Sequence, residues 1–69
     1  MNGNSLKVLR MKSGKRLKDV ARELNVSVQC VQAYEAAKSI TFERIEQYAR
    51  ILNDKELIQL TEQIKEKLL

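Results

Sequence analysis

The chain has 69 residues, enough for one small domain, and we expect that domain to cover residues 1–69. It contains no histidine and one cysteine, Cys30, which excludes an internal disulfide, a cysteine-rich metal site and histidine-based acid–base catalysis. No apolar run approaches the roughly 18 residues of a membrane span, and we recognise no signal peptide. We therefore expect a cytoplasmic protein that is not an enzyme and holds no metal or cofactor.

The net charge of +4 is concentrated near the start of the chain. Residues 1–18 carry six basic side chains and no acidic one, whereas residues 37–69 carry six of each, which cancel. A basic first quarter suits contact with nucleic-acid phosphates. A solvated, lysine-rich helix face explains the same charge equally well, so charge alone decides nothing.

The absence of proline, the two glycines and the lack of strand alternation predict an all-α fold. After a polar lead at residues 1–4, which we expect to be frayed, the first predicted helix covers residues 5–12, with Leu6 and Leu9 inward. Gly14 follows its end, where glycine readily adopts the left-handed backbone that terminates a helix.

Two short amphipathic helices are predicted next, over residues 17–24 and 28–35. Between them, Asn25 tolerates a left-handed backbone and Ser27 is a preferred N-cap for the second helix. Two helices joined by such a short turn form a helix-turn-helix unit, which offers its second helix to the major groove of DNA.

Two further helices complete the chain. The fourth is predicted over residues 41–52, with Thr41 as its N-cap and Tyr48 beside its apolar stripe. The fifth is predicted over residues 55–68. It carries an apolar stripe at helical spacing: Leu57, Leu60, Ile64 and Leu68.

These residues also carry a resemblance. The pattern comprises Val20-Ala21, Leu24-Asn25-Val26-Ser27, Val31 and Tyr34-Glu35, with Leu6-Lys7, Leu9-Arg10 and Gly14 before it and residues 41–53 after it. It resembles the phage Cro and repressor type of helix-turn-helix protein, the XRE superfamily, over roughly three-quarters of the chain. The resemblance implies a compact, five-helix, lambda-repressor-like DNA-binding domain whose third helix contacts the bases.

The sequence departs from that family at two positions. The family usually begins the second helix with a small polar N-cap followed by a glutamine that contacts the DNA backbone, whereas this chain has Arg16 and Leu17. Arg16 or Lys18 is expected to supply the missing contact. The family commonly has a glycine where this chain has Ala37, so either the helix extends or the loop differs.

Residues of the third helix that face away from the core are the candidates for base readout. They are Ser27, Val28, Gln29, Gln32 and Ala33. Basic and polar residues that bracket this helix are the candidates for phosphate contact. They are Lys15, Arg16, Lys18, Lys38 and Ser39. The competing interpretation is that both sets are solvated surface.

Two other features involve the third helix. The resemblance implies an ion pair between Arg10 and Glu35 that clamps the first helix to the third. Cys30 lies on the base-reading helix, so its oxidation would block DNA binding; the simpler interpretation is a small helix residue without a redox role.

The predicted function is that of a bacterial, phage or plasmid repressor bound to an inverted-repeat operator in the nucleoid. The stripe of the fifth helix either closes the core or forms a homodimer, and we favour the homodimer because one unit reads only half a site. The alternative function is a protein-interaction module, a helix-turn-helix remnant or anti-repressor that binds another regulator instead of DNA.

Overall fold

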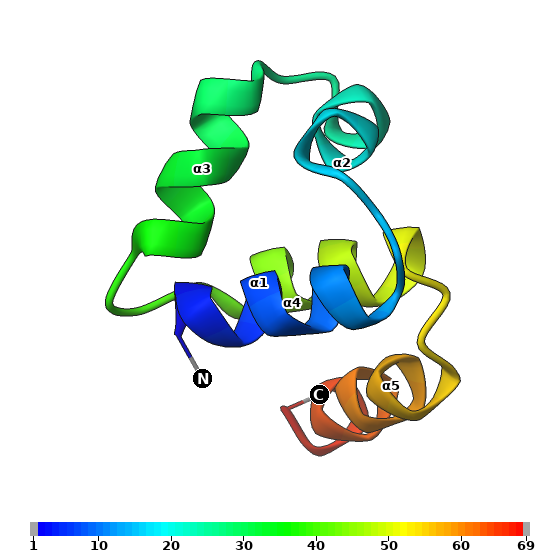
Figure 1. The fold of residues 1–69 in the computed structure, drawn as a ribbon. Helices are drawn as coiled ribbons and strands as arrows, with labels where there is room; N and C mark the ends of the chain where they lie inside the picture. The colour runs from blue at the N-terminus through cyan, green and yellow to red at the C-terminus, as the bar shows by residue number, and fades with distance from the viewer. Residues whose placement is uncertain (1, 69) are drawn as a thin grey trace.

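The computed structural model describes residues 2–68, apart from the side chain of Leu68, and this part of the chain consists of helices joined by short loops (Figure 1). The helices are α1 (Gly3–Lys12), α2 (Leu17–Leu24), α3 (Val28–Ala36), α4 (Phe42–Ile51) and α5 (Lys55–Leu68). No strand occurs within residues 2–68, which confirms the expected all-α fold.

Helix α1 begins two residues earlier than expected. The side chain of Asn2 caps it, because its Oδ1 accepts a hydrogen bond from the backbone N–H of Ser5 at 3.1 Å. The N–H of Gly3 donates to the carbonyl oxygen of Ala37, 2.9 Å away, and so ties the start of α1 to the end of α3. The expectation of a frayed lead is therefore wrong for residues 2–4.

The turn between α2 and α3 follows the chemistry of its residues. Asn25 adopts the left-handed conformation, with φ 57° and ψ 46°, and ends α2. Ser27 then caps α3, since its Oγ accepts from the N–H of Cys30 at 3.2 Å. Figure 1 shows the two helices at a steep angle, with α3 on one side of the molecule.

The core lies between the first four helices. Leu6, Val20, Val31 and Tyr48, from α1, α2, α3 and α4 in that order, are fully buried. Because each helix contributes at least one of these side chains, the core fixes α3 relative to its three neighbours.

The loop after α3 avoids the strain that an alanine could have caused. Ala37 has an extended backbone, with φ −68° and ψ 141°, and α3 continues to Ala36. No left-handed residue is needed at this position, so the glycine that is common in the family has no role here.

Helix α5 packs against α4. Asp54 caps it, because its Oδ1 accepts from the N–H of Leu57 at 3.1 Å. The side chain of Leu57 is only 8% exposed and is covered by its own chain, which corrects its assignment to a dimer interface. Leu60 and Ile64 are 51% and 38% exposed, and the side chain of Leu68 lies outside the described part.

Candidate nucleic-acid interface

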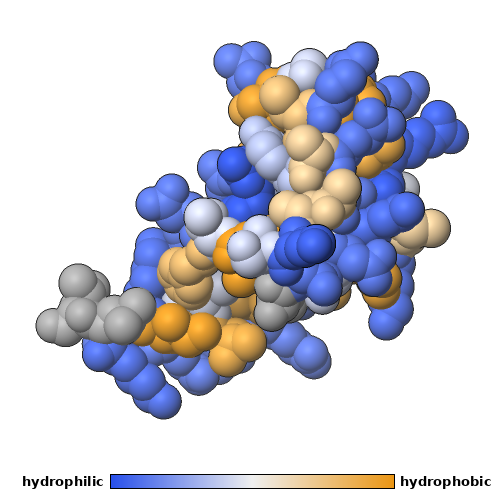
Figure 2. All heavy atoms as spheres, turned by 90° about the vertical axis from the view of Figure 1, so that its left-hand side faces the viewer, coloured by the Kyte–Doolittle hydropathy of each residue, from blue (hydrophilic) through white to orange (hydrophobic). Residues whose placement is uncertain are grey.

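The outward face of α3 carries no charge. Its exposed residues are Gln29, Cys30, Gln32, Ala33 and Ala36, and its N-cap Ser27 is exposed as well. The one charged residue of this helix, Glu35, is buried. On the side of the molecule that carries α3, a pale and weakly apolar band runs between hydrophilic flanks (Figure 2).

The structure separates the predicted base-reading residues into two groups. Gln29, Gln32 and Ala33 share the exposed face of α3. Val28, in contrast, is half-buried and packs against the core, because the first turn of α3 leans on α2 and its neighbours. Val28 can therefore offer only part of its side chain to a ligand.

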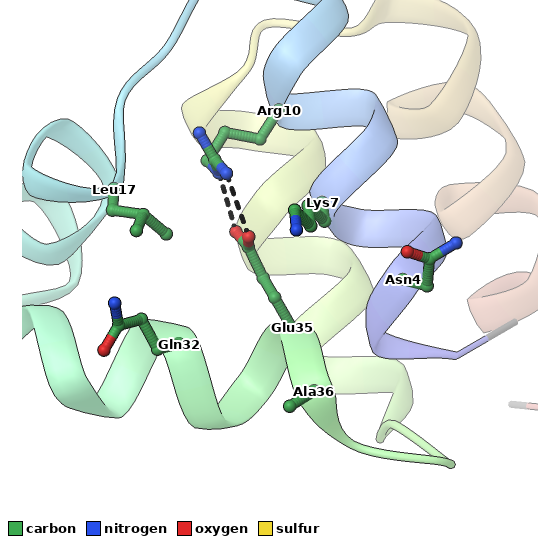
Figure 3. Close-up of a pocket in the computed structure, with 7 residues that line it drawn as sticks. All are labelled: Asn4, Lys7, Arg10, Leu17, Gln32, Glu35 and Ala36. Carbon is green, nitrogen blue, oxygen red and sulfur yellow. Dashed lines mark hydrogen bonds and ion pairs between the residues drawn. The ribbon is translucent and has the colours of Figure 1, made fainter.

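A buried hydrogen-bond network holds α3 from behind. Arg10 donates to both carboxylate oxygens of Glu35, from Nε to Oε2 at 2.8 Å and from Nη2 to Oε1 at 3.1 Å (Figure 3). The ion pair expected from the resemblance is thus present, with both residues 7% exposed. A further Arg10 nitrogen donates to the carbonyl oxygen of Lys15 at 2.8 Å, which anchors the loop before α2.

Tyr48 is a member of this network that the sequence did not reveal. Its hydroxyl donates to Oε2 of Glu35 at 2.9 Å, so this carboxylate oxygen accepts from α1 and α4 at once. Burial raises the pKa of the Tyr48 phenol, and the hydrogen bond to Glu35 and its negative charge raise it further. Tyr48 therefore remains a protonated donor at neutral pH.

The predicted phosphate-contact residues are all exposed. Lys15, Arg16 and Lys18 lie before and within the first turn of α2, and Lys38 and Ser39 lie in the loop between α3 and α4. Arg16 is the N-cap of α2 through its backbone, because its N–H donates to Oδ2 of Asp19 at 2.8 Å. That hydrogen bond holds the pKa of Asp19 below its usual value.

A hollow of ≈ 370 Å³ borders the exposed face of α3 on the side of α1 and α2 (Figure 3). We call it the α1–α3 hollow. It is lined by Asn4, Lys7, Arg10, Leu17, Gln32, Glu35 and Ala36. The ion pair forms part of its wall, and the side chain of Gln32 reaches from α3 toward Leu17.

A second, smaller hollow of ≈ 200 Å³ lies along α3 on the side of α4. Arg44, which the sequence reasoning also missed, lines it. The guanidinium carbon of Arg44 lies 3.6 Å from the centre of the Tyr34 ring, and Nη1 donates to Oε1 of Gln47 at 2.8 Å. These contacts hold a cation in a fixed orientation beside the outward face of α3.

Comparison with protein families identifies the family to which this chain belongs. A family described as helix-turn-helix matches residues 6–60, which is more than half of the chain. The chain belongs to the XRE-type helix-turn-helix family. As a member of that family it is a DNA-binding transcriptional regulator. Comparison with curated proteins and with solved structures found no match.

Three further observations bear on this helix-turn-helix protein. Within residues 2–68, no group of three or more histidine, cysteine, aspartate or glutamate side chains could hold a metal ion. Across the same described range, no helix is long and apolar enough to cross a membrane. Cys30 is a free thiol on the exposed face of α3, and a role for its oxidation stays a prediction.

Proposed function

We propose that this protein is a sequence-specific repressor of bacterial, phage or plasmid genes that places α3 in the major groove of its operator. The observation that carries the proposal is the outward face of α3, which has no charge and is bordered by exposed cations. Neutral amides and small side chains suit the edges of base pairs, while cations suit the phosphates on either side.

The proposed base contacts follow from the exposed side chains. Gln29 and Gln32 can each donate to N7 and accept from N6 of an adenine, and Ala33 can pack on a thymine methyl group. Ser27 reaches either kind of base from the N-cap, and Val28 contributes its exposed part. Each well-formed bidentate contact contributes about 1–3 kcal/mol of discrimination, which is enough to define a preferred sequence.

The proposed phosphate contacts come from both ends of the helix-turn-helix unit. Lys15, Arg16 and Lys18 would hold one stretch of the backbone, and Lys38 and Ser39 another. The buried network supports this arrangement, because Arg10 joins α3 to the carbonyl of Lys15 and thereby fixes the basic loop relative to the reading helix.

We further propose a homodimer that binds an inverted repeat. A two-fold axis would place two copies of α3 one DNA turn apart, about 34 Å. Leu60 and Ile64 support this assembly because they form an exposed apolar pair at i and i+4 on α5. Such a regulator would act at the nucleoid, in the cytoplasm of a bacterium.

A second candidate function is a protein-interaction module that binds another regulator. The same exposed pair on α5 favours it, because an apolar patch can receive a different chain as well as a second copy. Tight association with a different protein, without salt-dependent binding to DNA, would identify this function.

Selection from random duplex DNA at near-physiological salt tests the proposal. We expect enrichment of an inverted repeat with half-sites about one turn apart. Enrichment should be lost in Gln29→Ala combined with Gln32→Ala, which removes both amides from an exposed surface. Lys55→Gln on α5 serves as a control, because it lies on a helix that the proposal does not place in the groove. Binding only at low salt, without an enriched sequence, would refute specific recognition.

A further inference from the structure

Lys7 is a cation without a structural partner in the described part of the chain. Lys7 is an exposed residue of α1, and neither of the ion pairs within residues 2–68 includes it. It is also one of the residues that line the α1–α3 hollow. Lys7 is therefore placed to contact a ligand that enters this hollow.

The electrostatics of the hollow favour an anion. Its one carboxylate, Glu35, accepts two hydrogen bonds from Arg10 and one from Tyr48, so its charge and its acceptor oxygens are already matched. The charge of Lys7 is left over. The amides of Asn4 and Gln32 add neutral donors, and Leu17 supplies an apolar wall.

The position of the hollow indicates which anion it meets. Gln32 and Ala36 line the hollow and also belong to the exposed face of α3. An α-helix is about 10–12 Å across with its side chains and the major groove is about 12 Å wide, so the sugar-phosphate walls of the groove lie against the flanks of an inserted helix. The sugar-phosphate backbone on the side of α3 that faces α1 and α2 would therefore lie against the α1–α3 hollow.

We infer that the α1–α3 hollow receives one phosphate of the DNA backbone, with Lys7 as its cation and Gln32 as a neutral donor, so that Gln29 is the amide left to contact a base. This inference rests on the proposed function, because it requires α3 to lie in the major groove. It also explains how the chain holds the backbone near Leu17, whose side chain has no donor. The amide of Gln32 reaches that place from α3 (Figure 3), and the charge comes from α1.

Lys7→Gln tests the inference, with Lys12→Gln as the matched control. Both lysines are exposed residues of α1 and both changes remove one charge, but Lys12 lies about 140° further round the helix and does not line the hollow. The measurement is the DNA association constant as a function of salt, on the selected site and on unrelated DNA.

We expect Lys7→Gln to lower the slope of log K against log salt by about 0.9 for each bound subunit, and to weaken binding at 0.1 M salt by nearly tenfold for each subunit. The loss should be the same on both DNA sequences, because a phosphate contact carries no sequence information. Lys12→Gln should leave the slope unchanged. Equal slopes for the two variants would overturn the inference.

A neutral methylphosphonate placed at each backbone position in turn gives an independent readout. One position in each half-site should weaken binding of the wild-type chain but not of Lys7→Gln, because the interaction is already lost in that variant. Free inorganic phosphate, added at matched ionic strength, should not weaken DNA binding of the wild-type chain as the methylphosphonate does. If no position shows this coupling while wild-type binding remains strongly salt-dependent, the hollow is not a phosphate site and the proposed function stands. A wild-type chain without salt-dependent DNA binding would overturn both.

Discussion

At Gly3, the absence of a side chain permits a close contact between α1 and the end of α3. A Cβ atom built on it would meet the carbonyl oxygen of Tyr34 and come within 2.7 Å of the carbonyl carbon of Glu35. Both are backbone atoms at the end of α3, so neither can turn aside as a flexible side chain would. The absence of a side chain at Gly3 lets α1 approach α3.

We expect Gly3→Ala to lower the free energy of unfolding by about 1–3 kcal/mol, the usual cost of forcing an extra group into a packed contact. Urea denaturation followed by circular dichroism measures it. Asn4→Ala is the control, because Asn4 is exposed and its substitution should change stability by less than about 0.5 kcal/mol. Equal midpoints for Gly3→Ala and wild type would show that α1 can shift without cost.

The hydroxyl of Tyr48 should also contribute to stability, because it donates to Glu35. Tyr48→Phe keeps the ring and removes one donor from Glu35, so we expect a loss of about 1–3 kcal/mol at pH 8. The folded state raises the pKa of Tyr48 above its ordinary value of 10.0. The contribution of this group is therefore complete below pH 10 and declines as the pH rises further.

Denaturation of both chains at pH 8, 10 and 11 checks this dependence. The difference between wild type and Tyr48→Phe should be largest at pH 8 and should shrink toward pH 11. Taking the difference removes the titration of lysines and Tyr34, which both chains share. A difference that stays constant would mean that the phenol does not donate to a buried carboxylate.

The sequence predicted part of this network and missed the rest for a physical reason. The pairing of Arg10 with Glu35 followed from the resemblance, and both residues form that pair. Helical periodicity placed Tyr48 beside an apolar stripe, but its partner lies 13 residues away on another helix. Which polar atom a buried hydroxyl reaches depends on how α3 and α4 pack, and periodicity within α4 carries no information about that.

At the scale of helices, local cap signals placed the starts of α3 and α4. Ser27 and Thr41 accept from backbone N–H groups three residues on, as their types predict. The start of α1 was missed although Asn2 is such a cap, because the bond from Gly3 to Ala37 that stabilises this turn joins distant parts of the chain. Lys7 and Arg44 were missed likewise, because the hollows that they line form only when helices meet.

The ion pair between Arg10 and Glu35 joins α1 to α3, so removing one partner should destabilise the fold. Arg10→Leu leaves a buried carboxylate with the Tyr48 hydroxyl as its remaining donor, so we expect a loss of about 3–5 kcal/mol. That loss is comparable to the net stability of so small a domain, so the variant should melt at a much lower temperature or be largely unfolded at 25 °C. Replacing Glu35 by leucine in the same chain should recover much of the loss, because no charge is then left unpaired.

Lys65→Gln provides the matched control. It breaks the ion pair between Lys65 and Glu46, whose atoms lie 2.6 Å apart, but the Lys65 side chain is half-exposed. The Glu46 side chain is 19% exposed, so water still reaches both partners, and we expect a smaller loss than for Arg10→Leu, about 1 kcal/mol. Thermal denaturation of the four chains compares the two sites. An unchanged Tm for Arg10→Leu would refute the clamp.

For the whole molecule, the first four helices form the core and α5 lies outside it against α4. A chain of this length buries little apolar surface, and its net stability is only a few kcal/mol. Leu57 adds to that burial, whereas Leu60 and Ile64 leave apolar surface in water. The periodicity of α5 predicted one apolar stripe, but it could not show that the stripe is divided between the chain's own core and solvent.

Leu60 and Ile64, the exposed half of that stripe, are the proposed contact with a second copy of the chain. If α5 pairs with a second copy, Ile64→Lys and Leu60→Lys should each weaken the dimer by at least tenfold, since both place a charge in an apolar contact. Each should still fold, because neither side chain is buried in the single chain. Sedimentation equilibrium across a range of protein concentrations gives the mass.

Val8→Lys is the control, because Val8 is an exposed apolar residue, 42% accessible, on α1. It should leave the dimeric mass unchanged. On an inverted repeat, the monomeric variants should bind half-sites independently and lose the avidity that comes from two linked reading helices. If Ile64→Lys keeps a dimeric mass, the interface lies elsewhere. If wild type is a monomer at every concentration, the spacing of the half-sites must be set by the DNA or by another protein.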